Sequence, residues 1–190
     1  MVATVKVDWM KGFLMSNKRL NICFICSLFI ASIAMPVHAA YYTDVSVEYQ
    51  NVDVDGTELN PLSARIKLGV PFSRELGVEA SYAAAIRDDE VNGLKLESDE
   101  ILGLYTRYNS PDAYGGMTVF LLAGYAWTTI KTSGAYAIPN QKFEGFSWGA
   151  GIEERSKGAK RMRYTFQYTR YYDNDGLTID GYSLGLRYDF

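Results

Sequence analysis

The feature that most constrains the fold is a two-residue alternation of apolar and polar side chains, which recurs along most of the chain. The last ten residues, G-Y-S-L-G-L-R-Y-D-F, show it well, since large apolar side chains occupy every second position. Successive side chains of a β-strand point to opposite faces, so the pattern predicts strands with one apolar and one polar face. Eight segments bounded by Gly, Pro, Asn or Asp have this pattern: 42–51, 61–71, 76–87, 99–109, 117–130, 145–155, 161–172 and 178–190.

The connections between these segments alternate in length. Those after the first, third and fifth segments are long or polar, and the one after the seventh is shorter but acidic. The connections after the second, fourth and sixth segments are tighter. An up-and-down barrel with short turns at one end and longer loops at the other has this arrangement. The sequence therefore predicts an all-β fold, an eight-stranded antiparallel up-and-down β-barrel, in one domain that covers residues 40–190.

The first 39 residues differ from the rest of the chain. Lys18 and Arg19 precede an apolar stretch of about a dozen residues, and a small-residue cleavage motif follows and ends at Ala39. A secretory signal peptide has these three parts in this order. We therefore expect residues 1–39 to be a cleaved signal peptide, with translation starting at Met15 or at the first residue. The alternative is an N-terminal membrane anchor, for which the apolar stretch is short.

Cleavage at this position changes the chemistry that is available to the mature chain. Cys23, Cys26 and the only histidine, His38, leave with the signal peptide, while all 15 tyrosines remain. The mature chain then lacks the softer metal ligands and the side chain whose pKa lies nearest neutrality. We therefore expect no cofactor, no metal site and no enzymatic activity. The acidic net charge of the chain argues against nucleic-acid binding, which requires a basic surface.

Two kinds of eight-stranded barrel fit the alternation. A soluble, lipocalin-like barrel places its apolar face inside, whereas a transmembrane barrel places that face in lipid. The apolar face carries too many aromatic rings for the narrow lumen of an eight-stranded barrel. Tyr and Trp are also favoured at membrane interfaces, and several lie near the predicted strand ends: Tyr42, Tyr108, Trp127, Tyr171, Tyr172 and Tyr188. These observations favour a transmembrane barrel, and a soluble periplasmic carrier of an apolar ligand remains as the alternative.

The polar face carries charges of both signs in nearly equal numbers. Buried charge is tolerated only when it is paired and hydrogen-bonded, so we expect these side chains to pair across the lumen. The alternative is an ordinary solvated face of a sheet. The predicted lumen charge network consists of Asp44, Glu48, Arg65, Lys67, Glu79, Arg107, Glu153, Arg155, Arg163 and Arg187, with Asp189 as a further acid. Such a lumen argues against a wide pore, because porins need about twice as many strands; a small pore remains an alternative.

The last strand resembles the C-terminal sorting signal of bacterial outer-membrane barrels, which ends on an aromatic residue. The matching residues are Tyr182, Leu184, Leu186, Tyr188 and Phe190. With the export signal and the eight segments, residues 41–190 resemble the small outer-membrane barrels of the OmpA-transmembrane-domain, OmpX and Opa type. This resemblance implies the outer membrane of a Gram-negative bacterium, recognition of the last strand by the barrel-assembly machinery, and contact with outer-membrane lipid and lipopolysaccharide. It also implies a role in envelope integrity or in adhesion to a host or environmental surface. The lipid A-modifying enzymes among such barrels rely on a histidine, which the mature chain lacks.

The long connections are acidic, and we expect them to be extracellular loops. Asp53 and Asp55 are similar to the start of a calcium loop, since alternate oxygen ligands suit a hard cation, but the remaining ligands of an EF-hand are absent. The simpler interpretation is a solvated acidic rim beside lipopolysaccharide, bridged loosely by divalent cations. The predicted loop acids are Asp53, Asp55, Glu58, Asp88, Asp89, Glu90, Asp173 and Asp175.

Overall fold

A computed structural model describes residues 41–190 of the chain, except for 55–56, 88, 92–93, 112–115, 135–140 and 175. The side chains of 54, 57, 89–91, 94–99 and 131–134 are also not described. The predicted signal peptide, residues 1–39, therefore lies outside the described residues and stays a prediction. The same is true of three of the predicted loop acids, Asp55, Asp88 and Asp175.

Every regular element among the described residues is a β-strand, and none of them forms a helix that is long and apolar enough to cross a membrane. The strands are β1 (Tyr42–Val54), β2 (Thr57–Leu59), β3 (Leu62–Pro71), β4 (Leu76–Arg87), β5 (Asp89–Val91), β6 (Leu94–Asn109), β7 (Met117–Gly134), β8 (Gln141–Arg155), β9 (Met162–Asn174) and β10 (Leu177–Asp189).

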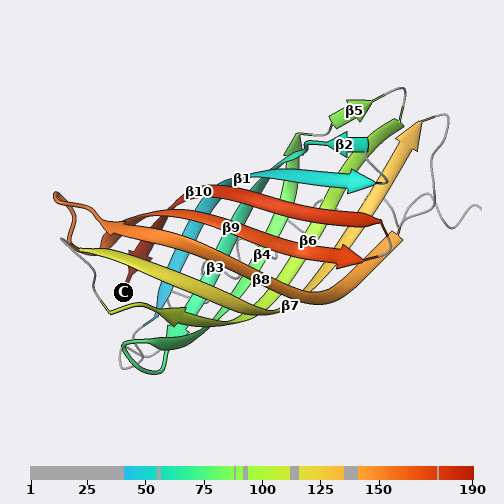
Figure 1. Ribbon diagram of the computed structural model, residues 1–190. Coiled ribbons are helices and arrows are strands. Elements are labelled where there is room, and N and C mark those ends of the chain that lie inside the picture. Colours follow the sequence, from blue (N-terminus) through green and yellow to red (C-terminus); the bar gives the residue numbers. More distant parts are fainter. Residues whose placement is uncertain are drawn as a thin grey trace, which may run out of the picture. The chain divides into compact units, whose positions relative to one another are not determined.

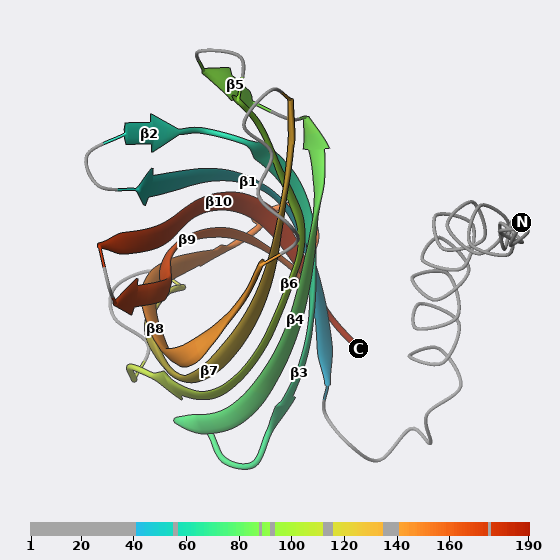
Figure 2. The ribbon, with the colours of Figure 1, turned by 90° about the vertical axis from the view of Figure 1, so that its right-hand side faces the viewer.

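The strands form one antiparallel sheet that closes on itself (Figures 1 and 2). β1 pairs with β3, each later long strand pairs with the next, and β10 returns to β1. The closing register runs from Tyr42–Asp189 to Val54–Leu177. β2 pairs with β1 beyond the end of β3, and β5 pairs with β6 beyond the end of β4, so the short strands lengthen two of the eight walls. The predicted eight-stranded barrel is therefore confirmed.

All eight predicted segments form strands, and the differences lie mainly at one end of the barrel. β6 begins at Leu94 instead of residue 99, and β8 begins at Gln141 instead of residue 145. β2 and β5 were not predicted. All these extensions lie at the end with the long connections, whereas the short turns and the C-terminus lie at the other end (Figure 1). At this end the strands stay paired although their sequence is polar. The alternation of apolar and polar side chains is therefore lost there and does not predict these strands.

The apolar face of the sheet points outward and the polar face points into the lumen. On β1, the side chains of Val45 and Val47 are 49% and 51% exposed, while those of Asp44 and Glu48 are 0% exposed. The same alternation continues around the barrel. The prediction of a transmembrane barrel is confirmed, and the lipocalin-like alternative is wrong because it requires an apolar lumen.

Outward aromatic rings contact one another at two levels of the barrel. Near the middle of their strands, the rings of Trp148 and Tyr182 both contact that of Tyr168, with centroids 5.5 and 5.2 Å apart. At the ends of the first and last strands, Tyr41 stacks on Phe190 at 4.5 Å. Aromatic rings on the outward face are typical of membrane barrels.

Two of the tyrosines that the sequence placed at the membrane interface lie in the lumen instead. Tyr42 and Tyr171 are only 3% and 1% exposed. Their hydroxyl groups donate hydrogen bonds of 2.7 Å to the carboxylates of Glu79 and Glu48, respectively. The interfacial prediction was wrong for these two residues because both lie on the inward-facing side of their strands, where a buried carboxylate accepts the phenolic hydrogen.

Candidate functional site

Ten of the eleven charged side chains that the sequence places in the lumen take part in at least one ion pair. The two signs are present in equal number, so the charge of the set is balanced. Pairing is what makes burial of these groups tolerable, because an unpaired charge in such a position is strongly destabilising. The acids are Asp44, Glu48, Glu79, Glu153 and Asp189, and the bases are Arg65, Lys67, Arg107, Arg163 and Arg187.

Arg65 connects four consecutive strands of the barrel wall through the lumen. Its Nη1 lies 2.6 Å from Oε2 of Glu48, on the neighbouring strand. The same nitrogen donates to the hydroxyl of Tyr171 at 2.8 Å, and Nη2 donates to the hydroxyl of Ser183. Tyr171 in turn donates to Glu48. Residues of β1, β3, β9 and β10 thus meet in one hydrogen-bonded group.

Lys67 makes a second connection across the lumen. Its Nζ lies 3.3 Å from Oδ2 of Asp44 and donates a hydrogen bond of 2.9 Å to Oε1 of Gln167, on β9. Both members of the ion pair are almost completely buried. The ammonium is therefore held between a carboxylate and a neutral amide oxygen.

Arg107 bridges two carboxylates from different strands. Its Nη1 lies 3.1 Å from Oε2 of Glu79 on β4, and its Nη2 lies 2.7 Å from Oε1 of Glu153 on β8. Glu153 also accepts from Arg187, whose Nη1 lies 3.0 Å from Oε2. The planar guanidinium groups suit such multiple contacts better than an ammonium does.

The chain of ion pairs continues to the mouth of the barrel at the short-turn end. Arg187 Nε lies 2.7 Å from Oδ1 of Asp189, and Arg163 Nε lies 2.9 Å from Oδ2 of the same carboxylate. A pocket of about 550 Å³ opens at this mouth. Its lining includes Glu153, Arg163 and Arg187, together with the turn residues Arg74 and Glu75.

Cations and aromatic rings alternate across the lumen. The Arg187 guanidinium carbon lies 3.5 Å from the centre of the Tyr42 ring. The Arg107 guanidinium carbon lies 5.5 Å from that ring and 3.8 Å from the ring of Phe120. Attraction between the cations and the ring faces therefore adds to the ion pairs. Phe120 interrupts the polar face of its segment in the sequence, and its inward position shows why.

An apolar cluster fills the lumen near the long connections, and sequence reasoning missed it. Its members lie on the inward side of their strands and adjoin the charged network, to which Tyr171 also belongs. A signal was present, because large aliphatic residues replace polar ones on that side near one end of several strands. The cluster comprises Val52, Leu59, Ala83, Ile101, Ala126, Ile130, Tyr171, Leu177 and Ile179, with Phe143 and Tyr172 packed against it.

Inward glycines make room for the rings in the lumen. A Cβ added to Gly69 would lie 2.0 Å from Cζ of Tyr42, and one added to Gly151 would lie 2.3 Å from Cζ of Phe120. Neither distance is compatible with an unmoved ring. These glycines are therefore required by the space that an aromatic side chain of a neighbouring strand occupies.

Replacing Gly69 by alanine should lower the free energy of unfolding by about 1–3 kcal/mol, because the added methyl group displaces the Tyr42 ring. That ring stacks against Arg187 and bonds to Glu79. Gly158→Ala is the matched control, since no atom lies within 4 Å of its added Cβ. Urea unfolding of residues 40–190 in lipid vesicles measures both. Equal stabilities of the two variants would contradict the proposed packing.

The structure differs from the predicted network at Arg155. Its side chain is exposed at the end of β8, whereas its neighbour Glu153 is buried. Both residues have inward parity, but Arg155 lies at the last position of its strand and in front of the short turn. The alternation along a strand predicts which face a side chain is on, but not how close it lies to the mouth of the barrel. The prediction that Arg155 belongs to the buried network was wrong for this reason.

The other predicted site residues divide between the long connections and the last strand. Glu58 is exposed on β2, Asp53 lies on β1, and Asp89 and Glu90 belong to β5. Asp173 is exposed and lies 2.9 Å from Nη1 of Arg170. The predicted assembly signal faces outward along β10, and its residues are Tyr182, Leu184, Leu186, Tyr188 and Phe190. Among the described residues, no group of three or more His, Cys, Asp or Glu side chains is arranged to hold a metal ion.

A closed antiparallel barrel with an apolar exterior, outward-facing aromatic rings and a lumen of paired charges defines a class, the small membrane-spanning β-barrels. The chain belongs to the family described as the outer membrane protein beta-barrel domain, whose model matches residues 24–190. It is thus a protein of the outer membrane of Gram-negative bacteria. No curated protein matches it in sequence.

Solved structures share the fold at low sequence identity. Ail of Yersinia pestis, solved in complex with the heparin analogue sucrose octasulfate, is 17% identical with a TM-score of 0.59, over 80% of this chain and 99% of that one. Neisserial surface protein A is 14% identical with a TM-score of 0.61, over 79% and 97% of the two chains. The N-terminal barrel of Pseudomonas aeruginosa OprF is 15% identical with a TM-score of 0.53, over 77% and 97%.

Proposed function

We propose that this protein is a non-enzymatic surface protein of the outer membrane, in which the barrel holds acidic connections that bind cationic groups of a host or environmental surface. In this orientation, the long connections face the exterior, and the short turns and the C-terminus face the periplasm. The observation that carries the proposal is the filled lumen, whose charges are engaged with one another. Because the lumen is filled, a partner would bind to the long connections on the exterior of the membrane.

The composition of the long connections sets the chemistry of this partner. They include Glu58 and Asp173, which are exposed, and further acids whose positions are known from the sequence alone. The heparin analogue bound to Ail is a polyanion. Acidic connections would repel such a ligand, so a basic protein surface or a layer of divalent cations fits this chain better.

Charge neutralisation in the connections tests the proposal. The variant carries Asp55→Asn, Glu58→Gln, Asp88→Asn and Asp175→Asn, and residues 40–190 are refolded in nanodiscs of phosphatidylcholine. We expect binding to immobilised polylysine at physiological salt to fall about tenfold or more, because opposite charges are lost from the contact. Lys160→Gln with Arg161→Gln, at the short-turn end, is the control and should not weaken it. Unchanged binding by the loop variant would refute the proposal.

The paired lumen also predicts that the barrel does not conduct ions. Arg107 spans from Glu79 to Glu153 and stacks on Phe120, so side chains occupy the cross-section at this level. In planar bilayers, we expect residues 40–190 to give a conductance no greater than that of a protein-free membrane. Discrete steps well above that background would support the alternative of a small pore.

The proposal of a non-enzymatic role has a separate chemical basis. Residues 40–190 contain no histidine and no cysteine. The buried carboxylates of the lumen are held by arginine or lysine, so they are poorly placed to exchange protons with a substrate. The ion-paired carboxylates of the lumen therefore support a non-enzymatic role. The conductance experiment tests the alternative of a pore, and the polylysine experiment tests surface binding.

A further inference from the structure

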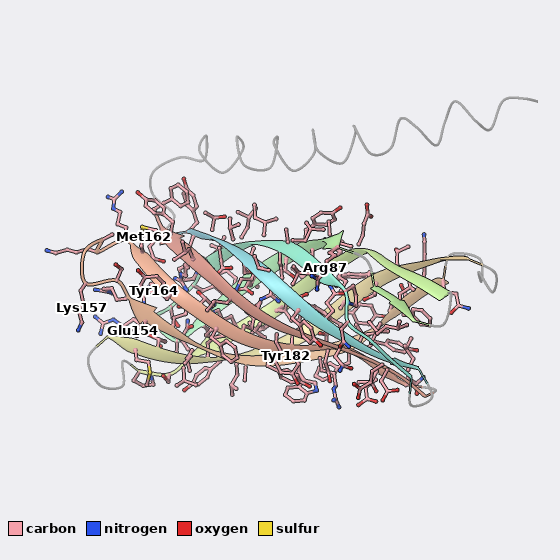
Figure 3. All side chains as sticks on the ribbon, turned by 90° about the horizontal axis from the view of Figure 1, so that it is seen from above. Arg87, Glu154, Lys157, Met162, Tyr164 and Tyr182 are labelled. Atoms are coloured by element: carbon pink, nitrogen blue, oxygen red, sulfur yellow. The ribbon has the colours of Figure 1, made fainter. Side chains whose placement is uncertain are left out.

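A second pocket lies on the outer surface of the barrel, where β8 turns into β9. Its volume is about 330 Å³. Figure 3 shows three of the residues around it, Glu154, Lys157 and Tyr164, at one end of the barrel. The lining residues are Glu154, Arg155, Ser156, Lys157, Gly158 and Tyr164. The pocket is separate from the charged lumen and from the long connections.

The register of β8 and β9 places this pocket next to the lipid-facing band. Ile152 pairs with Phe166, and both point outward and are about half exposed. The next outward pair toward the turn is Glu154 and Tyr164, which lines the pocket. A lipid whose acyl chains lie on the first pair therefore has its headgroup beside the second. The exposed Tyr164 suits this boundary because it joins an apolar ring to a polar tip.

The charges of the pocket fit a phosphate group. Arg155 and Lys157 are both exposed, and Glu154 is the only acid in the lining. Two further bases, Lys160 and Arg161, follow on the same turn. Arginine and lysine are the usual partners of phosphate oxygens in proteins. The excess of positive charge favours an anionic headgroup over a zwitterionic one.

Backbone hydrogen bonds hold the turn that lines the pocket. Ser156 N–H donates to the carbonyl of Met162 at 2.9 Å, and Met162 N–H donates to the carbonyl of Ala159 at 2.9 Å. Arg155 N–H donates to the carbonyl of Gly116, in the neighbouring turn, at 3.3 Å. At Gly158, an added Cβ would meet no atom within 4 Å. Arg155 and Lys157 thus line the pocket from a hydrogen-bonded turn, and both are exposed.

We propose that this pocket is a binding site for the phosphate of an anionic glycerophospholipid in the membrane leaflet at the short-turn end. Arg155 and Lys157 contact the phosphate oxygens, Glu154 accepts hydrogen bonds from headgroup hydroxyls, and the acyl chains lie along Ile152 and Phe166. The site would anchor the barrel in its leaflet at a defined depth. This proposal does not depend on the function of the long connections.

Native mass spectrometry of residues 40–190 released from mixed micelles tests the site. With equal amounts of phosphatidylglycerol and phosphatidylcholine, we expect one phosphatidylglycerol to be retained in preference to phosphatidylcholine. Arg155→Gln combined with Lys157→Gln should reduce its retention about tenfold, because two charge-assisted contacts are lost. Lys160→Gln combined with Arg161→Gln removes the same charge outside the pocket and should change retention by less than about twofold.

Three results would overturn the proposal. The first is equal retention of the two lipids by the wild type. The second is an equal loss in both double variants, which would indicate attraction to the net charge of the turn without a site. The third is displacement of the lipid by inorganic phosphate, which would make the pocket a site for the free anion. Heat-modifiable gel migration reports whether each variant is folded, and Lys157→Gln alone, with an expected partial loss, serves if the double variant does not fold.

Discussion

Replacement of Arg107 by methionine is expected to lower the free energy of unfolding by about 3–5 kcal/mol, which is the usual cost of removing one partner from a buried ion pair. Arg107 is almost completely buried and neutralises Glu79 and Glu153 at once. Without it, Glu79 retains the hydrogen bond from the hydroxyl of Tyr42, and Glu153 retains Arg187. The stack on Phe120 is lost as well.

A double-mutant cycle separates this pairing from a general effect of mutation. Glu153→Gln alone removes a charge that both Arg107 and Arg187 use. If the pair is formed, Arg107→Met combined with Glu153→Gln should be less destabilised than the sum of the single changes, with a coupling energy of about 0.5–3 kcal/mol. Urea unfolding in lipid vesicles, followed by tryptophan fluorescence, gives each free energy by linear extrapolation.

The exposed Arg155 provides the control for the same substitution in the same chain. In vesicles of phosphatidylcholine, which contain no anionic lipid, Arg155→Met should change the free energy of unfolding by no more than about 0.5 kcal/mol, because its side chain lies outside the buried network. A coupling energy near zero between Arg107 and Glu153 would rule out the pair. If Arg107→Met and Arg155→Met lowered the free energy of unfolding by similar amounts, burial of Arg107 would not explain the effect of its replacement.

Leu104→Arg should destabilise the barrel in lipid vesicles by about 2–4 kcal/mol, the range for an arginine on the lipid-facing side at the middle of a bilayer. Leu104 is 53% exposed and points outward from the centre of the stretch of β6, Glu100 to Tyr108, that pairs with β4. It pairs with Ala80 and Tyr125 of the neighbouring strands, which also belong to the outward face. A guanidinium at this position would have to lie in hydrocarbon or distort the bilayer.

Ile86→Arg is the matched control for this prediction. Ile86 is also an exposed, outward aliphatic residue, but it lies one position before the end of β4, at the end of the barrel with the long connections. Its replacement should cost about 0–1 kcal/mol, since arginine near the interface reaches the headgroups. Equal costs at the two positions would show that the outward band does not lie in a membrane at the depth inferred here.

Local sequence was sufficient to predict the strands and the side of the sheet that faces lipid. The alternation in segments such as 42–51 depends on two neighbouring residues at a time, so it is visible without knowledge of the partner strands. The many aromatic rings on the apolar face then indicated that this face points outward, because a narrow lumen has no room for them. Nearly equal numbers of opposite charges on the other face predicted the pairing of Arg65 and Arg107 with acids.

Other features depend on long-range register. Arg155 has the same parity as Glu153, but its place at the mouth of the barrel exposes it. The sequence placed Tyr42 at a membrane interface, and Phe120 interrupts the polar face of its segment. The glycines opposite these two rings show why both lie inside. The extensions near the long connections are strands through pairing with neighbours, since their sequence alone reads as polar loop.

The sequence by itself therefore determined the class of fold, the number of long strands and the inward and outward faces, because these follow from a two-residue period and from residue volume. Only the tertiary structure decided which charges are partners, which rings cross the lumen, and how Arg155 and Lys157 come to line a pocket beside the lipid-facing band. The physical reason is that contacts between strands depend on register and closure. These bring together residues such as Glu48, Arg65, Tyr171 and Ser183, which are far apart in the chain.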